Sequence, residues 1–101
     1  MKVNLTVYFS YERERENWKQ IIQNQISIFM PKITYKMQDT IDYIGCNIIY
    51  NAGTKYNITA TASKQGIITL KIGNKETGEE CISEFHPCDY NIIDYNIICF
   101  D

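Results

Sequence analysis

Residues 55–73 constrain the fold of this chain more than any other stretch. They contain two alternating runs of apolar and polar residues, separated by a short polar break that ends at Gly66. This pattern predicts a β-hairpin in which Gly66 adopts the positive φ of a tight connection. In the first run, Asn57, Thr59 and Thr61 alternate with apolar residues. One face of the hairpin should therefore be buried and the other exposed to solvent.

A strand and a long helix are predicted before the hairpin. Residues 2–9 alternate between polar and apolar side chains, which predicts a half-buried strand. Between residues 11 and 29 the apolar residues recur at helical spacing, which predicts an amphipathic helix with Ser10 as its N-cap and Pro31 beyond its end. These apolar residues are Trp18, Ile21, Ile22, Ile26 and Phe29.

Further strands are predicted at residues 33–37, 41–50 and 89–100. The apolar alternation slips at Gly45, which is typical of a bulge or kink. Residues 73–80 are expected to form a polar surface loop, and residues 81–88 an irregular segment that Pro87 interrupts. The last stretch nearly repeats a five-residue unit. We interpret it as a strand whose inward side chains are Ile93, Tyr95, Ile97 and Cys99, and a short helix after Asp89 is the alternative.

The predicted element order is β-α-β-β-β-β-β within a single domain spanning residues 1–101. The fold class is therefore α+β, with one long helix packed on one face of a mostly antiparallel five- or six-stranded sheet. Trp18, Ile21, Ile22 and Phe29 should cover that face, where Ala60 and Ala62 leave room for a large ring. The opposite face of the sheet should be free.

Composition and charge disfavour several classes of function. The net charge of −2 and the pI of about 5.3 are unlike those of proteins that bind phosphate backbones, so nucleic acid is a disfavoured partner. No glycine-rich phosphate loop or other cofactor signature is present in the sequence. No segment resembles a signal peptide or a membrane span, so we expect a cytoplasmic protein with reduced cysteines and no contact with membranes.

The sharpest candidate for chemistry is the group Cys81, His86 and Cys88. Two thiols and the only histidine lie within eight residues, and zinc is commonly held by such ligands. The same residues could pair a cysteine nucleophile with a histidine base. The spacing matches no familiar zinc motif, and the alternative interpretation is that the cysteines are small apolar residues beside an ordinary loop. We therefore predict no metal, no cofactor and no enzymatic activity, and keep a zinc domain or Cys/His enzyme as the alternative.

The excess of tyrosine favours a recognition surface. Eight tyrosines are present in 101 residues, and tyrosine is enriched where proteins meet. We predict that the free sheet face binds a partner through Tyr8, Thr34, Asn57, Thr59, Thr61 and Tyr90. The same face could stack the bases of single-stranded nucleic acid or a nucleotide, although no basic groove accompanies it.

The function that this pattern favours is a small protein-binding module that inhibits or neutralises its partner by occlusion. Immunity proteins and phage anti-defence or anti-CRISPR factors are proteins of this type, so the expected partner is a toxin or a component of host defence. A homodimer formed through a sheet edge is a further expectation, because unpaired strand edges often associate.

Overall fold

The computed structural model describes residues 1–29 and 33–100, which contain seven strands and two helices. The elements are β1 (Lys2–Phe9), α1 (Glu12–Phe29), β2 (Thr34–Asp39), β3 (Gly45–Asn51), β4 (Tyr56–Ala62), β5 (Ile68–Asn74), β6 (Glu80–Phe85), α2 (Pro87–Tyr90) and β7 (Ile92–Phe100). The predicted α+β class with antiparallel strands is confirmed, and so are the hairpin formed by β4 and β5 and the long helix.

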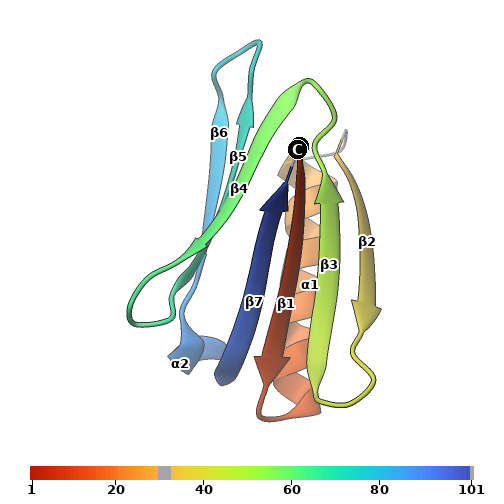
Figure 1. Ribbon diagram of the computed structural model, residues 1–101, viewed down its shortest axis with the longest axis vertical. Coiled ribbons are helices and arrows are strands. Elements are labelled where there is room, and N and C mark those ends of the chain that lie inside the picture. Colours follow the sequence, from red (N-terminus) through yellow and green to blue (C-terminus); the bar gives the residue numbers. More distant parts are fainter. Residues whose placement is uncertain (30–32, 101) are drawn as a thin grey trace.

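The strands form two antiparallel sheets, so the prediction of a single five- or six-stranded sheet was wrong. Sheet A has the order β2-β3-β1-β7 and sheet B the order β4-β5-β6. The chain leaves sheet A after Asn51 and enters sheet B at Tyr56, as Figure 1 shows at the upper end of the molecule. One helix cannot cover the inner faces of seven strands, whereas two sheets that face each other can bury them around one core.

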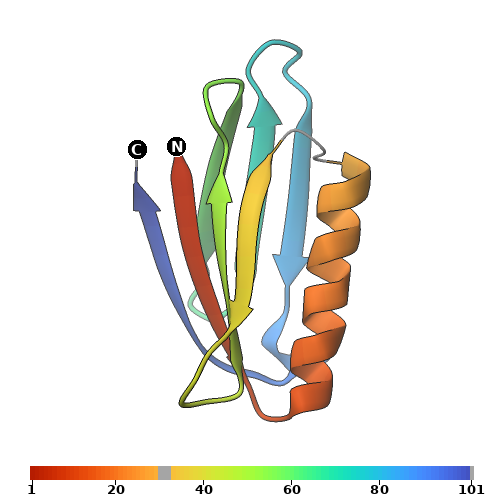
Figure 2. The ribbon, with the colours of Figure 1, turned by 90° about the vertical axis from the view of Figure 1, so that its right-hand side faces the viewer.

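Helix α1 closes the core between the two sheets. It runs alongside the strands, as Figures 1 and 2 show, and it contacts both sheets through polar side chains. At β6 the Ser83 hydroxyl donates to Gln25 Oε1 (3.1 Å), and at β2 the Lys19 ammonium donates to Asp39 Oδ1 (2.8 Å). The helix therefore spans the opening between the free edges of β6 and β2.

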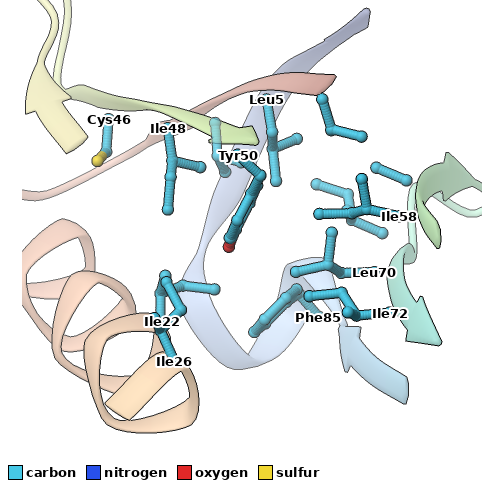
Figure 3. Packing of buried hydrophobic residues seen from close by; sticks show 14 of the residues in the cluster. Leu5, Ile22, Ile26, Cys46, Ile48, Tyr50, Ile58, Leu70, Ile72 and Phe85 are labelled. Atoms are coloured by element: carbon cyan, nitrogen blue, oxygen red, sulfur yellow. The ribbon is translucent and has the colours of Figure 1, made fainter. Parts of the chain in front are cut away.

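The core contains one cluster of buried side chains from both sheets and from α1. Figure 3 shows Tyr50 and Leu5 of sheet A opposite Ile58, Leu70 and Phe85 of sheet B, with Ile22 and Ile26 of the helix beside them. Trp18 is fully buried, and its ring packs against Phe9 (centroids 5.7 Å apart) and Phe85 (5.8 Å).

The predicted covering of the sheet by the helix is confirmed for Trp18 and Ile22, and Ile21 packs against the core from a half-buried position. The Phe29 side chain and Pro31 lie outside the described residues. A residue of β7 also lies close to Ala60. The Cys99 thiol of β7 donates to the Ala60 carbonyl oxygen, with a distance of 3.7 Å between sulfur and oxygen.

Residues 81–88 were predicted to be irregular, which was wrong for their first half. β6 pairs with β5 along its whole length, and Ser83 occupies an inward position between Cys81 and Phe85. The hydrogen bond from the Ser83 hydroxyl to Gln25 satisfies this polar group in the core. In the sequence, however, Ser83 interrupts the apolar pattern that would have predicted a strand. The expected loop at residues 73–80 is shorter, because β5 continues to Asn74 and β6 begins at Glu80.

The C-terminal segment contains both of the alternatives considered. α2 occupies Pro87–Tyr90, and β7 pairs with β1 from Ile92 to Phe100. The predicted inward parity of β7 is confirmed for Tyr95, Ile97 and Cys99, which lie opposite Val7, Leu5 and Val3. In the described residues, no helix combines the length and apolar character needed to cross a membrane.

Candidate functional site

The six residues predicted to bind a partner do not share one surface. Tyr8 and Thr34 lie on the outer face of sheet A, and Asn57, Thr59 and Thr61 lie on the exposed face of β4 in sheet B. Thr34 is aligned through Asn51 with Lys2, at the opposite end of β1 from Tyr8. Tyr90 lies in α2, and its ring packs against that of Phe85 at the end of β6, with 6.0 Å between centroids. Partial burial raises the pKa of the Tyr90 hydroxyl. The predicted set presupposed one sheet, whereas its members are distributed over the two sheets and α2.

The structure also separates Cys81, His86 and Cys88. Cys81 lies opposite Ile72 near the start of β6, and the rest of the strand, about 13 Å at ~3.3 Å per residue, separates it from Phe85 and the following His86. Cys88 is exposed on α2, and the imidazole Nε2 of His86 lies 3.5 Å from Glu84 Oε2. Within residues 1–29 and 33–100, no three histidine, cysteine, aspartate or glutamate side chains are grouped so that they could hold a metal ion.

Three strongly exposed apolar side chains lie together at one end of the molecule, where β1 ends and α1 begins, while others such as Ile28, Ile82 and Ile98 are exposed elsewhere. That end is the lower one in Figures 1 and 2, and it also contains the β2–β3 connection and the start of β7. Ile41 is 99% exposed, Tyr43 73% and Ile93 66%. Tyr8 adds a ring that meets Tyr43 edge-on, with 6.0 Å between centroids. We call the four residues Tyr8, Ile41, Tyr43 and Ile93 the end patch.

A β-bulge exposes Ile93. In the pairing of β1 with β7, Tyr8 lies opposite Asp94 and Phe9 opposite Ile92, so Ile93 has no partner on β1. An extra residue in a bulge changes the direction in which neighbouring side chains point. Of the two alternatives predicted at Gly45, a bulge is not present there, because Gly45 pairs regularly with Tyr8 and the bulge lies in β7. The chain instead bends at residues 41–44, directly before Gly45 begins β3.

Gly45 holds Tyr8 in place within the end patch. A Cβ atom at Gly45 would lie 2.7 Å from Cδ1 of Tyr8 and 3.0 Å from the carbonyl oxygen of Val7. Only glycine allows the tyrosine ring to lie so close to the backbone of the neighbouring strand. The β2–β3 connection that precedes Gly45 is fixed as well, because Thr40 donates its backbone N–H to the Gly45 carbonyl oxygen (3.0 Å) and its hydroxyl to the Tyr43 carbonyl oxygen.

Two open hollows share Tyr43 and Ile93 in their lining. The smaller, about 310 Å³, is lined by Tyr8, Tyr43, Ile93 and Asp94. The larger, about 490 Å³, is lined by Phe9, Glu12, Arg15, Thr40, Ile41, Asp42, Tyr43, Ile44 and Ile93. Because Tyr43 and Ile93 line both hollows, the two hollows adjoin at the end patch.

The rim of these hollows is acidic. Glu12 and Asp42 line the larger hollow and Asp94 the smaller one, and all three residues are exposed. Arg15 also lines the larger hollow, but its side chain is only 15% exposed. Its guanidinium lies 3.2 Å from Glu16 Oε1 and 3.6 Å from Asp39 Oδ2, so its charge is largely neutralised by its neighbours.

Comparison with protein-family models, curated proteins and solved structures finds no match to this chain. The site therefore has to be judged by its own geometry. Sequence reasoning missed Ile41, Tyr43 and Ile93 as exposed residues, because their positions fit strand alternation. The doubled isoleucine at 92–93 and the slip in alternation before Gly45 are the two signals in the sequence that mark this region.

Proposed function

We propose that this protein is a non-enzymatic binding module that occludes another protein, and that it binds this partner through the end patch. The observation that supports this proposal is the concentration of exposed apolar side chains in the patch. Single exposed apolar residues are common on protein surfaces, whereas a contiguous group with a polar rim is typical of interaction sites. Ile41, at 99% exposure, contributes no burial to this fold.

The geometry of the patch suits tight binding. The Tyr8 ring is confined between Gly45 and Tyr43, and the β2–β3 connection is fixed by the hydrogen bonds of Thr40. A surface that is ordered before binding loses less conformational entropy when a partner docks. Burying one exposed isoleucine against a partner contributes about 1.5–3 kcal/mol, so a few such residues can act as hot spots.

Occlusion is the mode of action that we propose, because it requires only a contact surface. Toxin-neutralising factors and inhibitors of host defence are the classes of small protein that act in this way. The partner would then be the toxin or the defence component whose working surface the end patch covers.

The experiment compares the protein with two serine variants. Ile41→Ser removes the most exposed apolar side chain of the end patch, and Ile82→Ser removes an isoleucine that is 58% exposed on β6, outside the patch. The three proteins are used to capture partners from a lysate of the source organism. Any captured protein is then purified, and its affinity for each of the three is measured by calorimetry.

The proposal predicts one captured protein whose affinity falls at least tenfold for Ile41→Ser and is unchanged for Ile82→Ser. A tenfold loss corresponds to about 1.4 kcal/mol, less than the burial of one isoleucine contributes. Equal affinity of the wild-type protein and Ile41→Ser for every captured protein would overturn the end patch as the binding site. Capture of no protein at all would overturn the proposed function. Circular dichroism of both variants shows whether the fold is retained.

A further inference from the structure

Resting on the proposed function, we infer that the partner presents an apolar side chain flanked by lysine or arginine, on a surface that is basic. This inference concerns the identity of the occupant of the end patch. It depends on the charges that surround the two hollows.

The three carboxylates at the rim form no ion pair with a described cation, although Lys64 lines a further hollow together with Ile93 and Asp94. Glu12 and Asp42 form no ion pair with any other described residue. Within the part of the chain that the structure describes, the Asp94 carboxylate accepts a hydrogen bond only from the backbone N–H of Tyr95 (2.8 Å), which orients the carboxylate without neutralising it. Arg13 follows Glu12 on α1 but lines neither hollow. A ligand in either hollow therefore meets a negative potential.

This potential excludes a second copy of the chain as the favoured occupant. Two end patches that face each other across a two-fold axis would bring Glu12, Asp42 and Asp94 near the same three carboxylates of the other copy. Like charges that face each other across an interface cost several kcal/mol and suppress association. The same potential disfavours nucleic acid, whose phosphates are negative.

A basic protein surface fits both features of the patch. An apolar side chain of the partner can enter the recess beside Tyr43 and Ile93, and flanking lysine or arginine side chains can reach the carboxylates at the rim. Each exposed ion pair of this kind adds little affinity, and such pairs accelerate association and select among partners more than they add to affinity.

The test uses peptides of equal length as probes. Each has a central leucine or phenylalanine, flanked by lysine in one series, by serine in a second and by glutamate in a third. Binding is followed through the NMR signals of the isoleucine methyl groups, because Ile41 and Ile93 report on the end patch. Titrations at low and high salt measure the electrostatic part of the affinity.

We expect the lysine series to shift the Ile41 and Ile93 signals with an affinity about tenfold higher than that of the serine series, as three exposed ion pairs would provide. High salt should remove this advantage. The triple variant Glu12→Gln, Asp42→Asn, Asp94→Asn should also remove it. The matched triple variant Glu76→Gln, Glu79→Gln, Glu84→Gln changes the net charge equally, away from the end patch, and should retain the preference.

The outcomes distinguish this inference from the proposed function. If the lysine and serine series bind the end patch equally, or if the two triple variants behave alike, the basic partner is overturned while the end patch remains a docking site. If the glutamate series binds best, the inference is also overturned. If no peptide shifts Ile41 or Ile93 at millimolar concentration, the end patch itself is overturned as a binding site.

Discussion

Strands β1 and β7 are neighbours in sheet A, yet the side chains that they turn toward the core are buried to very different extents. Val3, Leu5 and Val7 of β1 are completely buried. The residues opposite them on β7 are Cys99, Ile97 and Tyr95, and of these only Ile97 is half-buried, whereas the other two are exposed. β1 has a strand on both sides, whereas β7 pairs with β1 alone. The place of a strand in the sheet, rather than its periodicity, decides how much apolar surface it buries.

The backbone hydrogen bonds also differ between β1 and β7, because one edge of β7 has no neighbouring strand among the described residues. The Phe9 N–H donates to Ile44 on the β3 side, so by alternation the odd-numbered residues of β1 bond to β3 and the even-numbered ones to β7. On β7, Asp94 and its even-numbered neighbours then bond to β1, and the N–H of Tyr95 points to the free edge. This N–H donates to the side chain of Asp94 instead (2.8 Å). A carboxylate thus satisfies one backbone group for which the edge offers no strand.

The largest expected effect is a difference in stability between the two strands. Leu5→Ala should lower the free energy of unfolding by about 2–5 kcal/mol, because it leaves a cavity in the core. Ile98→Ala, on the exposed face of β7, should lower it by less than about 0.5 kcal/mol. Urea unfolding followed by Trp18 fluorescence measures both. Similar losses for the two variants would show that β7 is covered in solution.

The second effect compares two cysteines and depends on pH. Burial raises the pKa of Cys46, on the inner face of β3, from 9.0 to about 11, whereas Cys99 near the end of β7 is exposed. Above pH 9 the unfolded chain loses the Cys46 proton and the folded protein keeps it. The unfolded state therefore binds fewer protons, and stability falls as pH rises, by up to about 1.4 kcal/mol per pH unit.

The Cys46→Ala variant should lose most of this slope between pH 9 and 10, and Cys99→Ala should retain it. Restricting the range to pH 10 limits the contribution of Tyr50, whose pKa burial also raises from its usual value of 10.0. The measurement is the free energy of urea unfolding at each pH. An unchanged slope in Cys46→Ala would contradict the assignment to this thiol.

Local patterns in the sequence were sufficient to predict the elements with a regular period. β1, α1 and the β4–β5 hairpin each repeat their apolar residues at one spacing, and they form where predicted. β6 was missed because its middle inward residue is Ser83, and the hydroxyl partner that makes it acceptable, Gln25, lies 58 positions earlier. No local pattern contains that information.

The division into two sheets and the end patch both depend on contacts between distant parts of the chain. The segment between β3 and β4 looks like any turn, yet it moves the chain from one sheet to the other. Ile41 and Ile93 come together only because β1 pairs with β3 on one side and with β7 on the other. Sequence periodicity assigned both isoleucines to strands, whereas strand order and a bulge place them on the surface.

A third prediction concerns two tyrosines of sheet A. Here the substitution should raise the free energy of unfolding, whereas the changes above lower it. Tyr50 is completely buried, and its hydroxyl has no hydrogen-bond partner among the described residues. In Figure 3 its oxygen points into the core between α1 and sheet B. Removing an unsatisfied buried hydroxyl should stabilise the fold, so we expect Tyr50→Phe to raise the free energy of unfolding by about 1 kcal/mol.

The control for this prediction is Tyr95→Phe on β7. Tyr95 is 36% exposed, so its hydroxyl can be hydrated and its removal should leave stability unchanged within about 0.5 kcal/mol. Thermal unfolding followed by circular dichroism measures both variants. A loss of stability in Tyr50→Phe would show that the hydroxyl is hydrogen-bonded inside the core.

The smallest expected effect is a loss of stability at one edge strand of sheet A, β2, that is not expected at the other, β7. Strand β2 forms ion pairs with helix α1 through Asp39. Asp39 lies 2.8 Å from the Lys19 ammonium and 3.6 Å from the Arg15 guanidinium, and the hydrogen bond to Asp39 is the main reason that the pKa of Lys19 is raised. Asp39→Asn should therefore lower stability by about 0.2–1 kcal/mol, and the difference should shrink at high salt.

Hydrogen exchange shows whether this loss is local. Backbone amides of β2 should exchange faster in Asp39→Asn, because the edge is then held only by β3, while the amides of β7 should be unaffected. Asp94→Asn is the matched change on the other edge and should spare β2. If Asp39→Asn accelerates exchange equally in β2 and β7, the two edges open together and charge does not distinguish them. If the acceleration is confined to β2, one edge of the sheet is secured by ion pairs to the helix, and the other is left accessible beside the end patch.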